Sequence, residues 1–333
     1  MFNALFTLFV ACEFCYYLLI AQTGIVEVFH SDIHAFFTLP LGGILGSLLA
    51  YRSFGMLDTD QKKIIFFVAL QALCSLFYPS LNLVVLGLLG ISLGMSAPLL
   101  IKLTKGRFQE IAVALGITYA VAKALFTYEP ILRGNLAIAL SIVALVCSLF
   151  IHKLPAHKSE IATRQLSMYA VLSMAVWAFL DANLFETLSR SNDISIWRAQ
   201  TWHIILVFHL VGMGAAYWFK DTLKEHHSFI IAFLLALSYM LYAAREALLL
   251  SMVYPFVISY YNFVIIKRLS SLGNLKSLGM IMVFTGWIAG GGGLMSALFG
   301  YTYVGVIMIG ALLCSEIYNF FYQTSQKRIN NVQ

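Results

Sequence analysis

Residues 81–102 read LNLVVLGLLGISLGMSAPLLIK and contain no charged side chain before Lys102. A helix of about 20 apolar residues is long enough to cross the hydrocarbon core of a bilayer, so this stretch predicts a membrane-spanning helix. The rest of the chain is similar in character, because 61% of its 333 residues are hydrophobic and only 11% are charged. A soluble domain has about 25% charged residues. We therefore exclude a water-soluble enzyme, a disordered chain and a coiled coil.

Eleven further apolar segments flank this one, and helix-breaking residues such as Pro79-Ser80, Glu129-Pro130 and Gly273-Asn274 separate several of them. Twelve spans of this kind use about 240 residues, which leaves only short connections. The sequence therefore predicts an all-α membrane protein with twelve transmembrane helices. They are expected at about 2–22, 35–51, 63–78, 81–102, 109–127, 134–152, 166–188, 199–219, 228–245, 246–266, 277–299 and 301–323.

The basic residues are distributed unevenly between the two sides of these spans. If the N-terminus is cytoplasmic, sixteen of the 21 Lys and Arg residues fall in inner connections or the C-terminal tail, four fall in outer connections, and Lys123 lies within a span. Cytoplasmic loops of membrane proteins carry an excess of Lys and Arg. The asymmetry predicts that both termini are cytoplasmic, in a protein of the cell inner (plasma) membrane. It also explains the net charge of +6 without a nucleic-acid partner.

The two halves of the sequence show a weak internal repeat. A shift of 166 residues places most of the expected helices in register, with residues 46–51 on residues 212–217 and Gly134 on Gly300. Parallel repeats of this kind are a known plan of secondary transporters. The predicted organisation is an N-terminal six-helix half at 1–152, a cytoplasmic loop at 153–165, a pseudo-symmetric C-terminal six-helix half at 166–323 and a cytoplasmic tail at 324–333.

Short motifs agree with this plan. The connection between the second and third expected helices carries Gly46, Tyr51-Arg52, Gly55, Asp58, Lys62 and Lys63, and the fourth helix contains the run GISLGMSAP at 90–98. With twelve helices and a basic central loop, the whole chain resembles the major facilitator superfamily, although Tyr51 stands where that family has an acidic residue. The resemblance implies a secondary transporter that works by alternating access. It also implies a gate at the loop residues Arg52, Gly55, Asp58 and Lys62.

Glu13 is a candidate proton carrier in the first expected helix. A charged side chain in mid-membrane costs about 2.5–3.5 kcal/mol on insertion scales, so an acidic residue there is informative. Tyr16 and Tyr17 follow it within about one turn and are candidates for a substrate cavity. The alternative for Glu13 is a structural hydrogen bond to a tyrosine or to a neighbouring helix.

Asp181 is the second candidate for proton coupling. Met174 and Trp177 share its face of the expected helix 166–188, and Tyr254 and Tyr261 lie in the helix 246–266. The resemblance implies that the first, fourth, seventh and tenth helices line one central cavity, which Glu13 and Asp181 would face from opposite halves. Alternatively, Asp181 pairs with Lys123 or an outer arginine as a gate lock, and the tyrosines belong to an interfacial aromatic belt.

A third set of residues offers soft ligands for a metal. His209 and Met213 lie one turn apart, as do Cys12 and Cys15, and such ligands suit Cu(I). This set leaves a copper permease as an alternative function, and a non-transporting membrane partner or assembly protein is another. The sequence contains no phosphate-binding loop and no zinc-ligand spacing. We therefore expect no enzyme activity and no cofactor, and a monomer whose partners are membrane lipids, a small solute and protons.

Overall fold

The computed structural model describes residues 3–29, 32–126, 128–151, 166–191, 194, 196–197, 202–223 and 226–330. These residues are helical almost throughout and contain no β-strand beyond one isolated bridge between Phe54 and Leu57. The expectation of an all-α chain is confirmed. The helices are α1 (Ala4–Tyr16), η1 (Tyr17–Ile25), α2 (Val26–Phe29), α3 (Ile33–Leu49), α4 (Asp60–Ser75), α5 (Leu83–Leu103), α6 (Phe108–Leu125), η2 (Pro130–Leu132), α7 (Gly134–Ser148), α8 (Met168–Arg190), α9 (Trp202–Trp218), α10 (His227–Ala243), α11 (Ala247–Ser270), α12 (Leu275–Met282), η4 (Val283–Gly290), α13 (Gly291–Leu298) and α14 (Thr302–Asn330).

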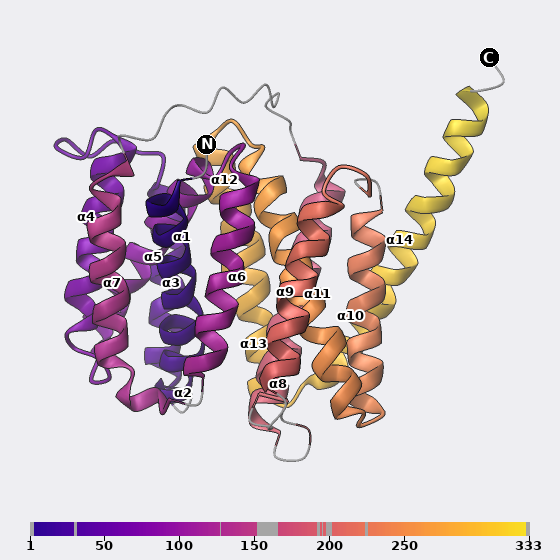
Figure 1. The fold of residues 1–333 in the computed structure, drawn as a ribbon, viewed down its shortest axis with the longest axis horizontal. Helices are drawn as coiled ribbons and strands as arrows, with labels where there is room; N and C mark the ends of the chain where they lie inside the picture. Colours follow the sequence, from indigo (N-terminus) through magenta and orange to yellow (C-terminus); the bar gives the residue numbers. More distant parts are fainter. Residues whose placement is uncertain are drawn as a thin grey trace. The chain divides into compact units, whose positions relative to one another are not determined.

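Some consecutive helices follow one another without a break, and we call each such continuous helix, or each single helix, a rod (Figure 1). Each expected apolar segment corresponds to one rod of the described chain. The first rod is α1, η1 and α2, and it continues to Phe29 rather than ending near residue 22. Among the described residues, six rods are long and apolar enough to cross a membrane. They span Ala4–Phe29, Leu83–Leu103, Phe108–Leu125, Met168–Arg190, Ala247–Ser270 and Leu275–Leu298.

Side-chain caps fix where several helices begin. Asn3, Thr59 and Asn82 each accept a hydrogen bond from a backbone N–H three residues later, at the starts of α1, α4 and α5. Asn274 caps α12 by accepting a hydrogen bond from the N–H of Lys276, two residues later. Such caps satisfy backbone donors that have no partner within the helix.

The chain forms two compact units. Unit 1 consists of Met1–Ser167 and Asn262–Trp287, and unit 2 consists of Met168–Tyr261 and Ile288–Gln333. The central loop 153–165 and residues 331–333 lie outside the described residues. In unit 1, α4 packs on both α5 and α7, and in unit 2, α14 packs on α10 and α8 (Figure 1).

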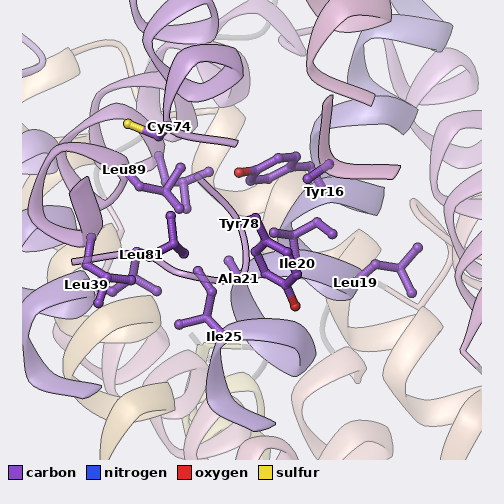
Figure 2. Close-up of a cluster of buried hydrophobic side chains, with 13 residues drawn as sticks. Tyr16, Leu19, Ile20, Ala21, Ile25, Leu39, Cys74, Tyr78, Leu81 and Leu89 are labelled. Atoms are coloured by element: carbon purple, nitrogen blue, oxygen red, sulfur yellow. The ribbon is translucent and has the colours of Figure 1, made fainter. Parts of the chain in front are cut away.

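The core of unit 1 gathers apolar side chains from helices far apart in the sequence. In Figure 2, Tyr16, Ile20 and Ile25 of the first rod lie among Leu39 of α3 and Leu89 of α5. Tyr16 and Ile20 have no exposed surface. Burial of these side chains holds the rods of unit 1 together around the first rod, which carries Glu13.

Glycines bring α3 and α5 into close backbone contact within unit 1. A methyl group at Gly46 would overlap the carbonyl oxygen of Ile91, and one at Gly94 would overlap that of Gly43. Small residues spaced four apart allow helices to approach closely where there is no hydrophobic force between them in lipid. The sequence 90–98, identified above as a family-like run, therefore has a packing role at Gly94.

Arg133 is a buried cation that ties one end of unit 1 together. Its Nη1 donates to the carbonyl oxygen of Leu19 at 2.8 Å and to the hydroxyl of Thr23 at 2.7 Å. Its other nitrogens donate to the carbonyl oxygens of Phe126 and Tyr128 at 3.0 Å and 2.9 Å. Leu19 and Thr23 belong to η1, so Arg133 supplies donors to the π-helical part of the first rod.

Candidate functional site

Glu13 lies in α1 with 7% of its surface exposed. The side-chain amide nitrogen of Gln71, on α4, lies 3.4 Å from Glu13 Oε1 and 3.3 Å from the hydroxyl of Ser141, on α7. One amide group thus joins three helices around the carboxyl group. No basic side chain forms an ion pair with Glu13 among the described residues. A carboxyl group in such surroundings is suited to binding and releasing a proton.

Sequence reasoning missed Gln71 and Ser141, although each is a polar residue inside an apolar helix. Both are fully buried, and Gln71 Oε1 has no hydrogen-bond partner. A buried polar atom without a partner costs free energy. Because Gln71 Oε1 can accept a hydrogen bond, protonation of Glu13 would offer it a donor and would favour a rotation of the Gln71 amide.

The two adjacent tyrosines that follow Glu13 point in different directions. Tyr16 is fully buried and shares a hydrogen bond of 2.9 Å with the hydroxyl of Ser75 on α4. Tyr17 is 40% exposed at its position on the rod. Successive residues of a helix are rotated by about 100°, so the two side chains cannot share one surface. Tyr16 alone lies on the side of the rod that faces the core of unit 1.

Asp181 lies on α8 in unit 2, where two tyrosines of α11 enclose its carboxyl group. The hydroxyl of Tyr254 donates to Oδ1 at 2.8 Å and also lies 2.9 Å from the Asp181 carbonyl oxygen. The hydroxyl of Tyr261 donates to Oδ2. The two tyrosines are seven residues apart, which places them on one face of α11. The structure therefore brings together three of the predicted site residues.

Further buried apolar and aromatic side chains belong to this part of unit 2. Met174 and Trp177, both predicted from the sequence, are fully buried on α8. Sequence reasoning missed Trp197. The centre of its ring lies 5.9 Å from the ring centre of Tyr254 and 5.1 Å from that of Phe185. Trp197 comes from the connection after α8, and no periodic pattern in the sequence pointed to it.

A hydrogen-bonded group next to Asp181 joins α8 to two more helices of unit 2. The hydroxyl of Tyr239, on α10, donates to the Leu180 carbonyl oxygen at 2.8 Å and to Asn183 Oδ1 at 2.9 Å. The amide nitrogen of Asn183 reaches the carbonyl oxygen of Gly293 at 3.4 Å. These contacts fix the rotation of α8 and hence the direction in which Asp181 points.

The predicted loop gate lies in the connection between α3 and α4. Asp58 and Lys62 form an exposed ion pair of 2.7 Å, and the Lys62 hydrogen bond holds the pKa of Asp58 below its usual value. The Arg52 guanidinium lies over the ring of Tyr51, and Gly55 has a φ of +43°. A left-handed backbone conformation of this kind favours glycine. The structure explains Gly55 as a turn residue, and a gating role for the loop stays a prediction.

The four predicted metal ligands are divided between the two units, with two in each. Cys12 and Cys15 are buried in unit 1, where the thiol of Cys15 lies 3.8 Å from the carbonyl oxygen of Thr118. His209 and Met213 are buried in unit 2, and His209 Nδ1 forms a hydrogen bond of 2.7 Å with the hydroxyl of Ser259. The described residues contain no group of three or more His, Cys, Asp or Glu side chains that could hold a metal ion.

A copper permease can be tested directly through these residues. His209→Ala, Met213→Ala and the double variant Cys12→Ala/Cys15→Ala should leave cellular copper unchanged, since a His–Met pair supplies only two soft ligands. The measurement is cellular copper by mass spectrometry in strains that express each variant. A loss of copper accumulation common to all three variants would contradict this expectation and support the copper alternative.

Comparison with solved structures places the arrangement of helices among known membrane proteins. The crystal structure of FucP, a major facilitator superfamily transporter in the outward conformation, aligns with a TM-score of 0.55 and 14% identity, over 94% of this chain and 96% of that chain. The chain has the major facilitator superfamily fold. Its apolar rods and this fold make it an integral membrane protein.

Two other solved structures of this fold give the same result. The proton:xylose symporter XylE aligns with a TM-score of 0.58 and 12% identity, over 92% of this chain and 93% of that chain. A bacterial homologue of the iron transporter ferroportin, in an outward-facing state, aligns with a TM-score of 0.57 and 14% identity, over 96% of this chain and 98% of that chain. No family model matches the sequence, and no curated protein matches it. At 12–14% identity these likenesses show the fold, and the function of this chain has to be argued from its own residues.

Proposed function

We propose that the protein is a secondary transporter that moves a small solute across the cell inner (plasma) membrane by alternating access, driven by protons. The observation that carries this proposal is the pair of buried carboxyl groups, Glu13 and Asp181, in a chain with the major facilitator superfamily fold. Neither carboxyl group forms an ion pair within the described residues. Intramembrane acidic residues of this kind are typical of ion and proton pathways.

The proposed transporter works as a monomer, with six-helix halves at 1–152 and 166–323 and with its termini and central loop in the cytoplasm. Binding and release of a proton at Glu13, Asp181 or both would change which conformation is more stable. A ligand shifts such an equilibrium only through its different affinity for the two states. The proton gradient is the energy source in this proposal, so no ATP-binding region is required.

Transport can be tested with the purified chain in proteoliposomes. A panel of labelled solutes is offered with and without a pH gradient across the vesicle membrane. Accumulation of a solute only when the gradient is present supports the proposal. Equal distribution of every solute under both conditions, in vesicles that contain folded protein, would contradict it and favour the non-transporting alternative.

The proposed topology predicts that reporter fusions at Pro155 and Gln333 are both cytoplasmic. The reason is the excess of Lys and Arg on one side of the predicted spans. Paired alkaline phosphatase and green fluorescent protein fusions measure the side of each site, and a fusion at Arg133 serves as the matched outer control. Periplasmic activity at either of the first two sites would contradict the twelve-helix arrangement.

A further inference from the structure

Asp181 differs from two other buried acidic residues in what neutralises it. Glu110 lies 3.9 Å from Arg107, and Glu186 forms an ion pair with Arg190 one turn away. Asp181 is buried, yet the hydrogen-bond partners of its carboxyl group are the phenols of Tyr254 and Tyr261. An ionised carboxylate in apolar surroundings needs an opposite charge. The part of the chain that the structure describes provides no such ion pair for Asp181.

The side chains that contact the Asp181 carboxyl group are aromatic, and further aromatic rings pack on one of them. Tyr254 and Tyr261 are at most 4% exposed and lie against the carboxyl group through their hydroxyls, while Trp197 packs on the ring of Tyr254. Phe185, one turn after Asp181 on α8, packs on Trp197. Aromatic faces attract ammonium groups, and the attraction grows where water is excluded. One acidic group within several aromatic rings is the chemistry that recognises an organic cation.

Glu13 has a different environment. Its hydrogen-bond partner is the amide of Gln71, and Gln71 is itself bonded to the hydroxyl of Ser141. The flanking thiols of Cys12 and Cys15 are also buried in this unit. Amide, hydroxyl and thiol groups can relay or accept a hydrogen bond, but they offer no aromatic face to an ammonium ion. The two buried carboxyl groups are therefore suited to different tasks.

We infer that Asp181, Tyr254, Tyr261 and Trp197 form the binding site for a monovalent organic cation, an amine or quaternary ammonium compound. This inference names the substrate class of the transporter proposed above and rests on that proposal for its physiological role. Asp181 supplies the negative charge, Trp197 and Tyr254 supply aromatic faces, and the tyrosine hydroxyls hold the carboxylate in place when no cation is bound. Of the two proposed proton carriers, this assignment leaves Glu13 to bind and release the proton.

Binding of a cation can be measured without any gradient, using the full chain purified in detergent and labelled tetraethylammonium as the probe. Wild-type protein should bind the probe saturably, and excess unlabelled probe should displace it, whereas xylose and acetate should not. Asp181→Asn should weaken binding about tenfold or more, because it removes the charge but keeps an acceptor for the tyrosines. Trp197→Leu should weaken binding about three- to thirtyfold.

Two variants separate a specific site from general effects on the protein. Glu186→Gln removes a buried negative charge from the same helix, and Glu110→Gln removes a buried negative charge from unit 1. Both should bind the probe as the wild type does. If Asp181→Asn is not recovered as folded protein, Trp197→Leu and Tyr254→Phe decide the question by the same binding measurement.

Several results would overturn the inference. They are the absence of saturable binding to folded wild-type protein, equal binding by Asp181→Asn, and equal loss of binding in Glu186→Gln. Because the assay contains no pH gradient, its outcome is independent of proton coupling. A chain that accumulates a neutral solute with protons but does not bind tetraethylammonium would refute the cation site alone. A chain that binds the cation through Asp181 but transports nothing would refute the transport proposal alone.

Discussion

Replacing Glu13 with Gln should abolish proton-driven accumulation of solute while the folded protein remains in the membrane. Glutamine has nearly the same shape and can still form a hydrogen bond with Gln71, but it cannot bind and release a proton. The measurement compares uptake into proteoliposomes with an imposed pH gradient and uptake without one. The gradient-dependent part should fall to background, and exchange of solute without a gradient should persist.

The matched control for this variant is Glu110→Gln. Both glutamates are 7% exposed and belong to unit 1, but Glu110 lies beside Arg107 rather than beside an amide. Glu110→Gln should keep pH-driven uptake. Full pH-driven uptake in Glu13→Gln would show that Glu13 does not couple transport to protons, and Asp181 would then be the remaining proposed carrier.

Replacing Gly94 with Ala should destabilise unit 1 strongly, although alanine is the better helix former. The added methyl group would overlap the backbone of Gly43, and two backbones cannot yield as a flexible side chain does. Overpacking of a tight core costs about 1–3 kcal/mol, and occasionally more. Thermal unfolding of the purified chain in detergent, followed by loss of the monodisperse peak in size-exclusion chromatography, measures the effect.

Gly87→Ala provides the control on the same helix. A methyl group at Gly87 would lie 3.5 Å from a methyl group of Thr38, which is ordinary van der Waals contact. This variant should unfold at or above the wild-type temperature, since alanine favours a helix by about 1 kcal/mol over glycine. Similar behaviour of Gly87→Ala and Gly94→Ala would contradict the close approach of α3 and α5.

Local properties of the sequence were enough to place the helices. The expected segment 81–102 corresponds to α5 at Leu83–Leu103, and the segment 228–245 corresponds to α10 at His227–Ala243. Each residue contributes separately to the transfer of a segment from water to lipid, so hydropathy summed along the chain finds such segments. The charge of Asp181 and the seven-residue spacing of Tyr254 and Tyr261 are also local properties, so they could be read from the sequence.

Contacts between helices were decided only by the tertiary structure. Nothing in the sequence paired Gln71 with Glu13, separated Tyr16 from Tyr17 or placed Trp197 against Tyr254. In a soluble helix, polar residues mark the face that meets water, and the opposite face is the core. In a membrane, lipid and protein core are both apolar, so the pattern does not show which face is buried. The sequence by itself determined an all-helical membrane protein and its candidate acids, while the rotation of each helix, and with it the groups around each acid, came from packing between helices.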